Sequence, residues 1–120
     1  MRRLFFRKWE KNMDISKKQY KIVFTSDCIR EMDYIYNYIT LNLYASKAAK
    51  QLMNTVQQAI ENLKIMPKIH KVIKNYIELE LEYRRIVIGN YVVIYTISER
   101  ERIIYIVHMY YGGRNYLEDI

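Results

Sequence analysis

The stretch YRRIVIGNYVVIYTI, residues 83–97, decides the fold. Its two halves, residues 83–88 and 91–97, are rich in the β-branched and aromatic side chains that are typical of strands. Gly89 and Asn90 between them are a pair that suits a two-residue hairpin turn. The second half is apolar on both faces, which predicts an interior strand of the sheet with both of its faces covered.

The segments on either side extend this hairpin. Downstream, a polar turn at residues 98–101 leads into a third apolar strand at residues 102–109, so we expect a meander. Upstream, residues 20–25 (YKIVFT) alternate as a short strand does. Residues 68–81 are mixed in character, and we interpret them as a connection that includes a short strand or a turn.

Two amphipathic helices lie between the first strand and the hairpin. Apolar residues recur every three or four positions, as on the buried face of a helix; they are Ile29, Met32, Ile35, Tyr36, Ile39 and Leu43, then Ala48, Ala49, Leu52, Met53, Val56, Ala59, Ile60 and Leu63. Ser26 and Asp27 are candidate N-caps of the first helix, and Ser46 of the second. Pro67 ends the second helix near Met66. The predicted fold is α+β: a two-helix hairpin packed on a small, mainly antiparallel sheet, in the order β-α-α-β-β-β.

Charge divides the chain into two parts. The protein has 120 residues and a formal net charge of +7, from 20 Lys and Arg against 13 Asp and Glu. Five basic residues and one acid give residues 1–12 a charge of +4. We therefore expect a flexible basic leader over residues 1–18 and one folded domain over residues 19–120. Met13 offers a second possible start of translation.

Cysteine usage and hydropathy exclude two classes of protein. Cys28 is the only cysteine, so no internal disulfide can form, and we interpret it as a small buried residue. The longest strongly apolar run, residues 103–107, is far shorter than the ~20 residues of a membrane-spanning helix. We expect a cytoplasmic protein with no membrane partner.

The C-terminal third resembles a known family. The segment YRRIVIGNYVVIYTISERERIIYIVHMYYGGRNYLEDI, residues 83–120, is similar to the second half of RelE/ParE toxins of type II toxin–antitoxin systems. The shared features are a basic residue entering a strand, a glycine hairpin, an aliphatic strand, a charged turn, and a strand ending in histidine. Leu63, Met66 and Pro67 resemble the helix end of that family.

The resemblance implies a function and its partners. It implies a toxin of a plasmid-stabilising addiction module that inhibits growth and is neutralised by a cognate antitoxin in a hetero-oligomer. Two targets stay open: DNA gyrase, as for ParE-like members, or mRNA in the ribosome, which RelE-like members cut. If the protein is an enzyme, it is a metal-independent endoribonuclease. No cofactor and no metal are expected.

For the ribonuclease alternative, the candidate catalytic residues are basic or aromatic. RNA cleavage without a metal needs a base, an acid and a cation at the phosphate. The candidates are Arg84, Arg85, His108, Arg114 and Tyr116. The two adjacent arginines of the first hairpin strand must face opposite sides of the sheet, so only one of them reaches a shared groove. The other reading of these arginines is a pairing with Glu80 or Glu82, and that of His108 is a structural role.

One position departs from the nuclease pattern. RelE-like nucleases carry an arginine just after the hairpin, and Val92 stands there in this chain. The loss of that phosphate contact favours the gyrase target slightly, although Arg84 or Arg85 can replace it. Tyr34, Tyr38 and Tyr44 form a further aromatic face, which is either ordinary packing or a surface for the antitoxin or the target.

The basic leader gives a first testable prediction. A chain that lacks residues 1–12 is expected to keep its fold and its toxicity, and to bind nucleic acid of random sequence more weakly, because +4 of charge is removed. Thermal melting, growth after induction and fluorescence anisotropy with a random duplex measure these three properties. A folded product that no longer arrests growth would make the leader part of the working protein.

Overall fold

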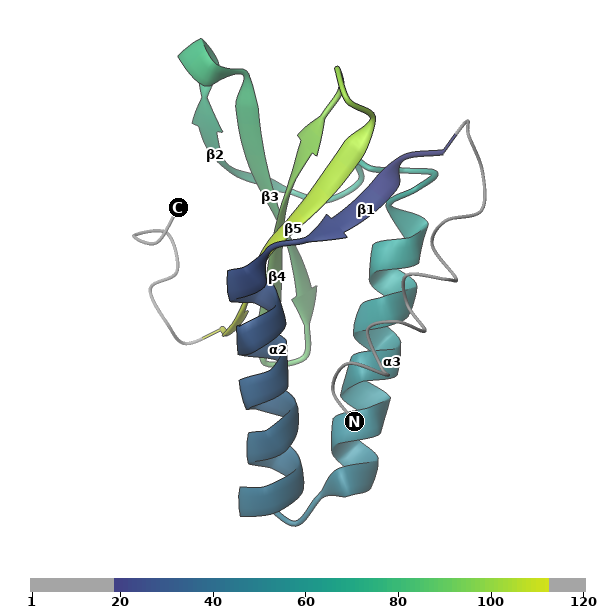
Figure 1. Cartoon of the computed structure of the whole chain (residues 1–120), viewed down its shortest axis with the longest axis vertical. Coiled ribbons are helices and arrows are strands. Elements are labelled where there is room, and N and C mark those ends of the chain that lie inside the picture. Colours follow the sequence, from purple (N-terminus) through teal and green to yellow (C-terminus); the bar gives the residue numbers. More distant parts are fainter. Residues whose placement is uncertain (1–18, 113–120) are drawn as a thin grey trace.

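The computed structural model describes residues 19–112. The expected leader over residues 1–18 lies outside this range, as do the candidates Arg114 and Tyr116. The elements follow the predicted order with one added strand (Figure 1). They are β1 (Lys21–Phe24), α2 (Ser26–Asn37), a π-helical turn (Tyr38–Asn42), α3 (Ser46–Asn62), β2 (Val72–Tyr76), a 3₁₀ turn (Ile77–Leu79), β3 (Leu81–Ile88), β4 (Tyr91–Ser98) and β5 (Ile103–Tyr111).

The sheet has five strands in the order β1-β5-β4-β3-β2. Strand β4 lies at its centre, as its two apolar faces predicted, and is antiparallel to both β3 and β5. Strand β2 adds antiparallel to β3 and comes from residues 68–81, for which the sequence predicts a connection with a short strand or a turn. Strand β1 pairs in parallel with β5, so the sheet is mixed and mainly antiparallel.

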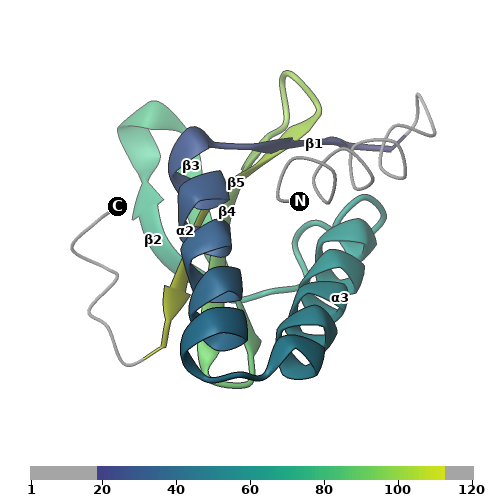
Figure 2. The same cartoon turned by 60° about the horizontal axis from the view of Figure 1, so that its bottom comes forward.

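Both helices pack on one face of this sheet and form the main core. Helix α2 and helix α3 run antiparallel and are joined at one end by a short loop (Figures 1 and 2). Their apolar stripes meet alternate residues of the strands; the fully or nearly fully buried members include Met32, Met53, Val56, Ile60, Val93, Tyr95, Ile104, Ile106 and Met109. A smaller cluster of Val92, Ile94 and Tyr110 covers part of the opposite face. The predicted α+β fold with its helical hairpin is therefore confirmed.

The helix ends differ in detail from the prediction. Thr25, and not Ser26 or Asp27, is the N-cap of α2, because its Oγ1 accepts from the N–H of Cys28 at 3.1 Å. The same hydroxyl donates to the carbonyl of Val107 at 2.7 Å and so joins the helix start to β5. Ala45 caps α3 with no side-chain bond, and Ser46 is already helical.

Helix α3 ends at Asn62, four residues before Met66. The N–H groups of Leu63, Lys64 and Ile65 bond to carbonyls three residues back, so the chain tightens into a turn before Pro67 is reached. The last predicted turn is also shifted by one residue, because β4 continues to Ser98 and β5 begins at Ile103.

Candidate functional site

Arg84 and Arg85 lie on opposite faces of β3. Arg84 is paired with Tyr95 of β4 on the helix-covered face, and 8% of its surface is exposed. Its Nη1 donates to the carbonyls of Lys68 at 3.1 Å and His70 at 2.7 Å, and its Nη2 donates to Glu82 at 3.2 Å. These hydrogen bonds of the guanidinium are made to other residues of the same chain. Arg84 thus ties the chain that follows α3 to the sheet.

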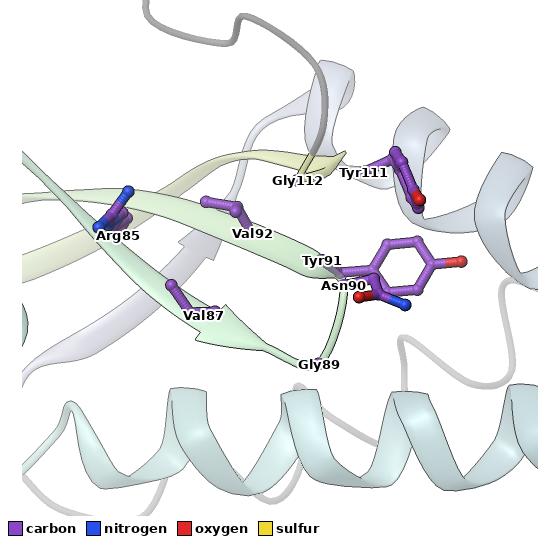
Figure 3. Close-up of a pocket in the computed structure, with 8 residues that line it drawn as sticks. All are labelled: Arg85, Val87, Gly89, Asn90, Tyr91, Val92, Tyr111 and Gly112. Carbon is purple, nitrogen blue, oxygen red and sulfur yellow. The ribbon is translucent and has the colours of Figure 1, made fainter.

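Arg85 lines a pocket at the hairpin end of the sheet. The cavity measures about 370 Å³ and is lined in part by the β3–β4 turn; its lining residues are drawn in Figure 3. Its lining combines one cation, backbone of the turn and apolar or aromatic side chains: Arg85, Val87, Gly89, Asn90, Tyr91, Val92, Tyr111 and Gly112. Val87 is directly opposite Val92 in the register, so Arg85 is the diagonal neighbour of Val92 on the same face. The guanidinium of Arg85 therefore lies beside Val92, the position that corresponds to the arginine of RelE-like nucleases.

Gly112 closes one side of this pocket by a close backbone approach. Its N–H donates to the carbonyl of Asn90 at 2.6 Å, which joins the end of β5 to the hairpin turn. A Cβ at this position would lie 3.0 Å from that carbonyl oxygen, which is closer than side chains normally come. Gly112 is the last residue that the structure describes.

His108 is held by a carboxylate of α2. Its Nδ1 lies 3.0 and 3.1 Å from the two carboxylate oxygens of Glu31, and its ring stacks on Tyr110 with 4.8 Å between centroids. Since a carboxylate only accepts hydrogen bonds, this contact places a proton on Nδ1. Glu31 Oε1 also accepts from the N–H of Met109 at 3.1 Å. The histidine ring is therefore fixed in orientation at the end of β5.

Sequence reasoning missed Glu31. This residue flanks the apolar stripe of α2 and lies next to Met32, so it looks like an ordinary solvent-facing acid. The pairing of β1 with β5 stops at Ile106, so beyond that residue β5 has a paired strand, β4, on one side only. The sequence offered one signal. The strand predicted at residues 102–109 is longer than the one at residues 20–25, so backbone groups near its end need a side chain as hydrogen-bond partner.

Arg85 and His108 share one face of the sheet but are separated by an apolar residue. Ile94 pairs with Arg85 on one side and with His108 on the other, and its own side chain is 0% exposed. Two strand spacings put about 10 Å between the backbones of the two groups. The structure brings these two candidates to one face, places Arg84 on the other, and leaves Arg114 and Tyr116 outside the described residues.

The other reactive side chains serve packing. Cys28 is fully buried, and burial raises the pKa of its thiol well above the usual range, so the thiolate is disfavoured. Burial raises the pKa of Tyr95 to about 12, and its hydroxyl donates to the carbonyl of Pro67 at 2.6 Å. Burial, and then the charge of Arg84, lower the pKa of His70 and so disfavour its charged form.

Within residues 19–112, no three or more His, Cys, Asp and Glu side chains gather in a way that would hold a metal ion. No helix in the described part of the chain is both long enough and apolar enough to span a bilayer.

A family model places the chain among known proteins. The model of the ParE toxin of the type II toxin–antitoxin system parDE matches residues 22–116. The chain belongs to this ParE toxin family. It is therefore a toxin of a type II toxin–antitoxin system, as the resemblance of residues 83–120 to RelE/ParE toxins implied. The match covers all the described strands except Lys21, the first residue of β1.

The chain is similar to solved structures of toxin–antitoxin complexes. One is the archaeal RelE–RelB complex from Pyrococcus horikoshii, with 19% identity, a TM-score of 0.52, and coverage of 80% of this chain and 98% of that one. A second is the toxin–antitoxin complex RelBE2 from Mycobacterium tuberculosis, with 19% identity, a TM-score of 0.48, and coverage of 78% and 98%. No curated protein matches the sequence.

Proposed function

We propose that this ParE-family toxin arrests bacterial growth by binding DNA gyrase, and that a cognate antitoxin neutralises it. The observation that carries the choice of target is the fully buried Ile94 between Arg85 and His108. A ribonuclease needs its cation, acid and base around one phosphate. Here an aliphatic side chain lies between the two described candidates, and Val92 adds a second one.

The contacts of the other candidates support the same target. Arg84 directs its guanidinium to main-chain carbonyls and to Glu82 on the helix-covered face, so it points away from the pocket. His108 keeps one ring nitrogen bonded to Glu31, which suits a residue that holds α2 against β5. These arrangements favour a surface that binds a protein over a centre that transfers protons.

Cleavage of ribosome-bound mRNA is the second candidate function. It is favoured by Arg85, whose guanidinium lies in the pocket diagonally across from Val92 and can take the place of the missing arginine. In that case Arg85 binds the phosphate and His108 moves a proton through Nε2, while Arg114 and Tyr116 complete the site. The antitoxin partner is proposed by analogy with the RelE–RelB complex, whose toxin chain has the same fold.

The target assay separates these two functions. The wild type, His108→Ala and Arg114→Ala are induced in cells that lack the antitoxin, and both mRNA 5′ ends and DNA double-strand breaks are mapped. A gyrase poison is expected to give DNA breaks and intact mRNA. His108→Ala should then change toxicity little, while Arg114→Ala should weaken it through a lost contact.

A ribonuclease would give the opposite pattern. Codon-phased mRNA cuts with intact DNA, abolished by both substitutions, would overturn the gyrase proposal, because proton transfer and phosphate stabilisation each contribute about 10²- to 10⁴-fold to such a reaction. Thermal melting of both variants supplies the control for folding.

A further inference from the structure

The closed end of the helical hairpin exposes an unusual set of large apolar side chains. We call this set the hairpin tip; it consists of Tyr34, Tyr38, Leu41, Leu43 and Tyr44, all of them exposed. The loop that carries it extends beyond the β3–β4 turn (Figure 1). Tyr34 and Tyr38 stack with 6.2 Å between ring centroids, which sets two aromatic rings side by side where α2 passes into the π-helical turn. Clustered exposed apolar groups of this kind mark interaction surfaces.

The backbone of the tip is as unusual as its side chains. Residues Tyr38–Asn42 form a π-helical turn, a rare structure that is found frequently at functional sites. Tyr44 has a φ of 51°, a left-handed conformation that is an outlier for a bulky residue and that glycine or asparagine adopts more easily. Its side chain is 90% exposed, so it contributes almost no buried area in return. The fold therefore gains nothing from a tyrosine at this position.

Charge indicates which partner fits the tip. From residue 34 to residue 60 the only charged side chains are Lys47 and Lys50, both exposed at the start of α3. A second copy of a chain with a net charge of +7 would be repelled from this positive surface. An acidic surface with pockets for aromatic rings is complementary to it, because tyrosines anchor interfaces and lysines at the rim attract the opposite charge.

We infer that the hairpin tip is the surface by which this toxin binds its target, through an acidic, aromatic-accepting patch on the target protein. This inference rests on the proposed function, since it assumes that the toxin acts by binding a protein. The rings of the tip supply the anchors, and Lys47 and Lys50 orient the approach of the two proteins.

The test removes two side chains of the tip without disturbing the fold. The variant Leu41→Gln/Tyr44→Asn deletes an aliphatic side chain and an aromatic ring, and asparagine suits the left-handed backbone of residue 44. Its matched control is Ile77→Gln/Leu79→Gln, which changes two equally exposed apolar residues of the 3₁₀ turn between β2 and β3. Each variant is assayed for melting temperature, antitoxin affinity, growth arrest and binding to purified gyrase.

The tip variant is expected to melt at or above the wild-type temperature, to keep its antitoxin affinity, and to bind gyrase about ten- to a hundred-fold more weakly. The control should behave as the wild type in all four assays. Lys47→Glu/Lys50→Glu should also weaken gyrase binding, and more than Lys21→Glu/Lys71→Glu, which makes the same charge change at two other exposed lysines. Gyrase binding by the wild type should fall with rising salt.

The outcomes distinguish failure of the inference from failure of the proposed function. A folded tip variant that still arrests growth at wild-type potency overturns the inference, and so does a tip variant that loses antitoxin affinity. If the wild type does not bind gyrase and the tip variant nevertheless loses toxicity, the tip is the target surface and the proposed target is wrong. Equal loss of toxicity in the tip variant and its control would also overturn the inference.

Discussion

Replacing Val93 with aspartate is expected to unfold the protein. Val93 is 0% exposed at the centre of β4, where it pairs with Ile86 of β3 and Met109 of β5 beneath the helices. An aspartate there must either bury an unpaired charge or take up a proton, and it also leaves part of the core empty. We expect a loss of about 4 kcal/mol or more. Total stabilities of about 5–15 kcal/mol leave little margin for such a loss.

The control for this prediction is the same substitution one strand away. Val87 of β3 is exposed on the opposite face, so Val87→Asp should cost no more than about 1 kcal/mol, the range of strand preferences. Urea unfolding followed by circular dichroism measures both variants. Equal midpoints for Val93→Asp and the wild type would mean that β4 is not the buried centre of the sheet.

The second large effect is expected at Arg84, with Arg85 as its matched partner. Arg84→Met keeps the aliphatic stem but removes the donors to the carbonyls of Lys68 and His70, which lose their partner beside the buried Tyr95. Two part-buried acceptors left without a donor predict a loss of about 2–4 kcal/mol. The ion pair with Glu82 adds little, because 44% of the Glu82 side chain is open to water.

Arg85→Met is expected to cost much less stability than Arg84→Met, about 1 kcal/mol or less, because Arg85 lines an open pocket. Chemical denaturation of the two variants gives the comparison directly. A larger loss for Arg85→Met would reverse the assignment of the two arginines to the structural and pocket faces. A difference in toxicity per folded molecule would then show whether the pocket contributes to growth arrest.

The central hairpin could be predicted because every local signal agreed. In residues 83–97 the turn pair, the β-branched runs and the apolar faces all specify one pairing, and the observed register places Ile88 opposite Tyr91. Strand β2 could not be predicted with the same certainty. Its residues VIKNY have a mixed pattern, and it becomes a strand because β3 offers a free edge for pairing.

Which of Arg84 and Arg85 faces the core was less predictable than the hairpin and more predictable than β2. Strand β4 is apolar on both faces, so it does not indicate which face the helices cover. The isoleucines of β3, Ile86 and Ile88, share the face of Arg84, and this alternation was a weak sign that Arg84 points to the core. Glu31 was beyond prediction, because its contacts with His108 and Met109 depend on how α2 lies across the end of β5.

The parallel pairing of β1 with β5 has a consequence for synthesis on the ribosome. Lys21 and Ile103 are partners in the sheet, so the first strand must wait for the last one to be translated. Contacts so distant in sequence form late, because a long loop has to close first. A nascent chain that stops before residue 103 holds two helices with no complete sheet to cover their apolar faces. Premature termination therefore yields unfolded, aggregation-prone fragments. The toxin folds only when its mRNA has been translated almost to the end.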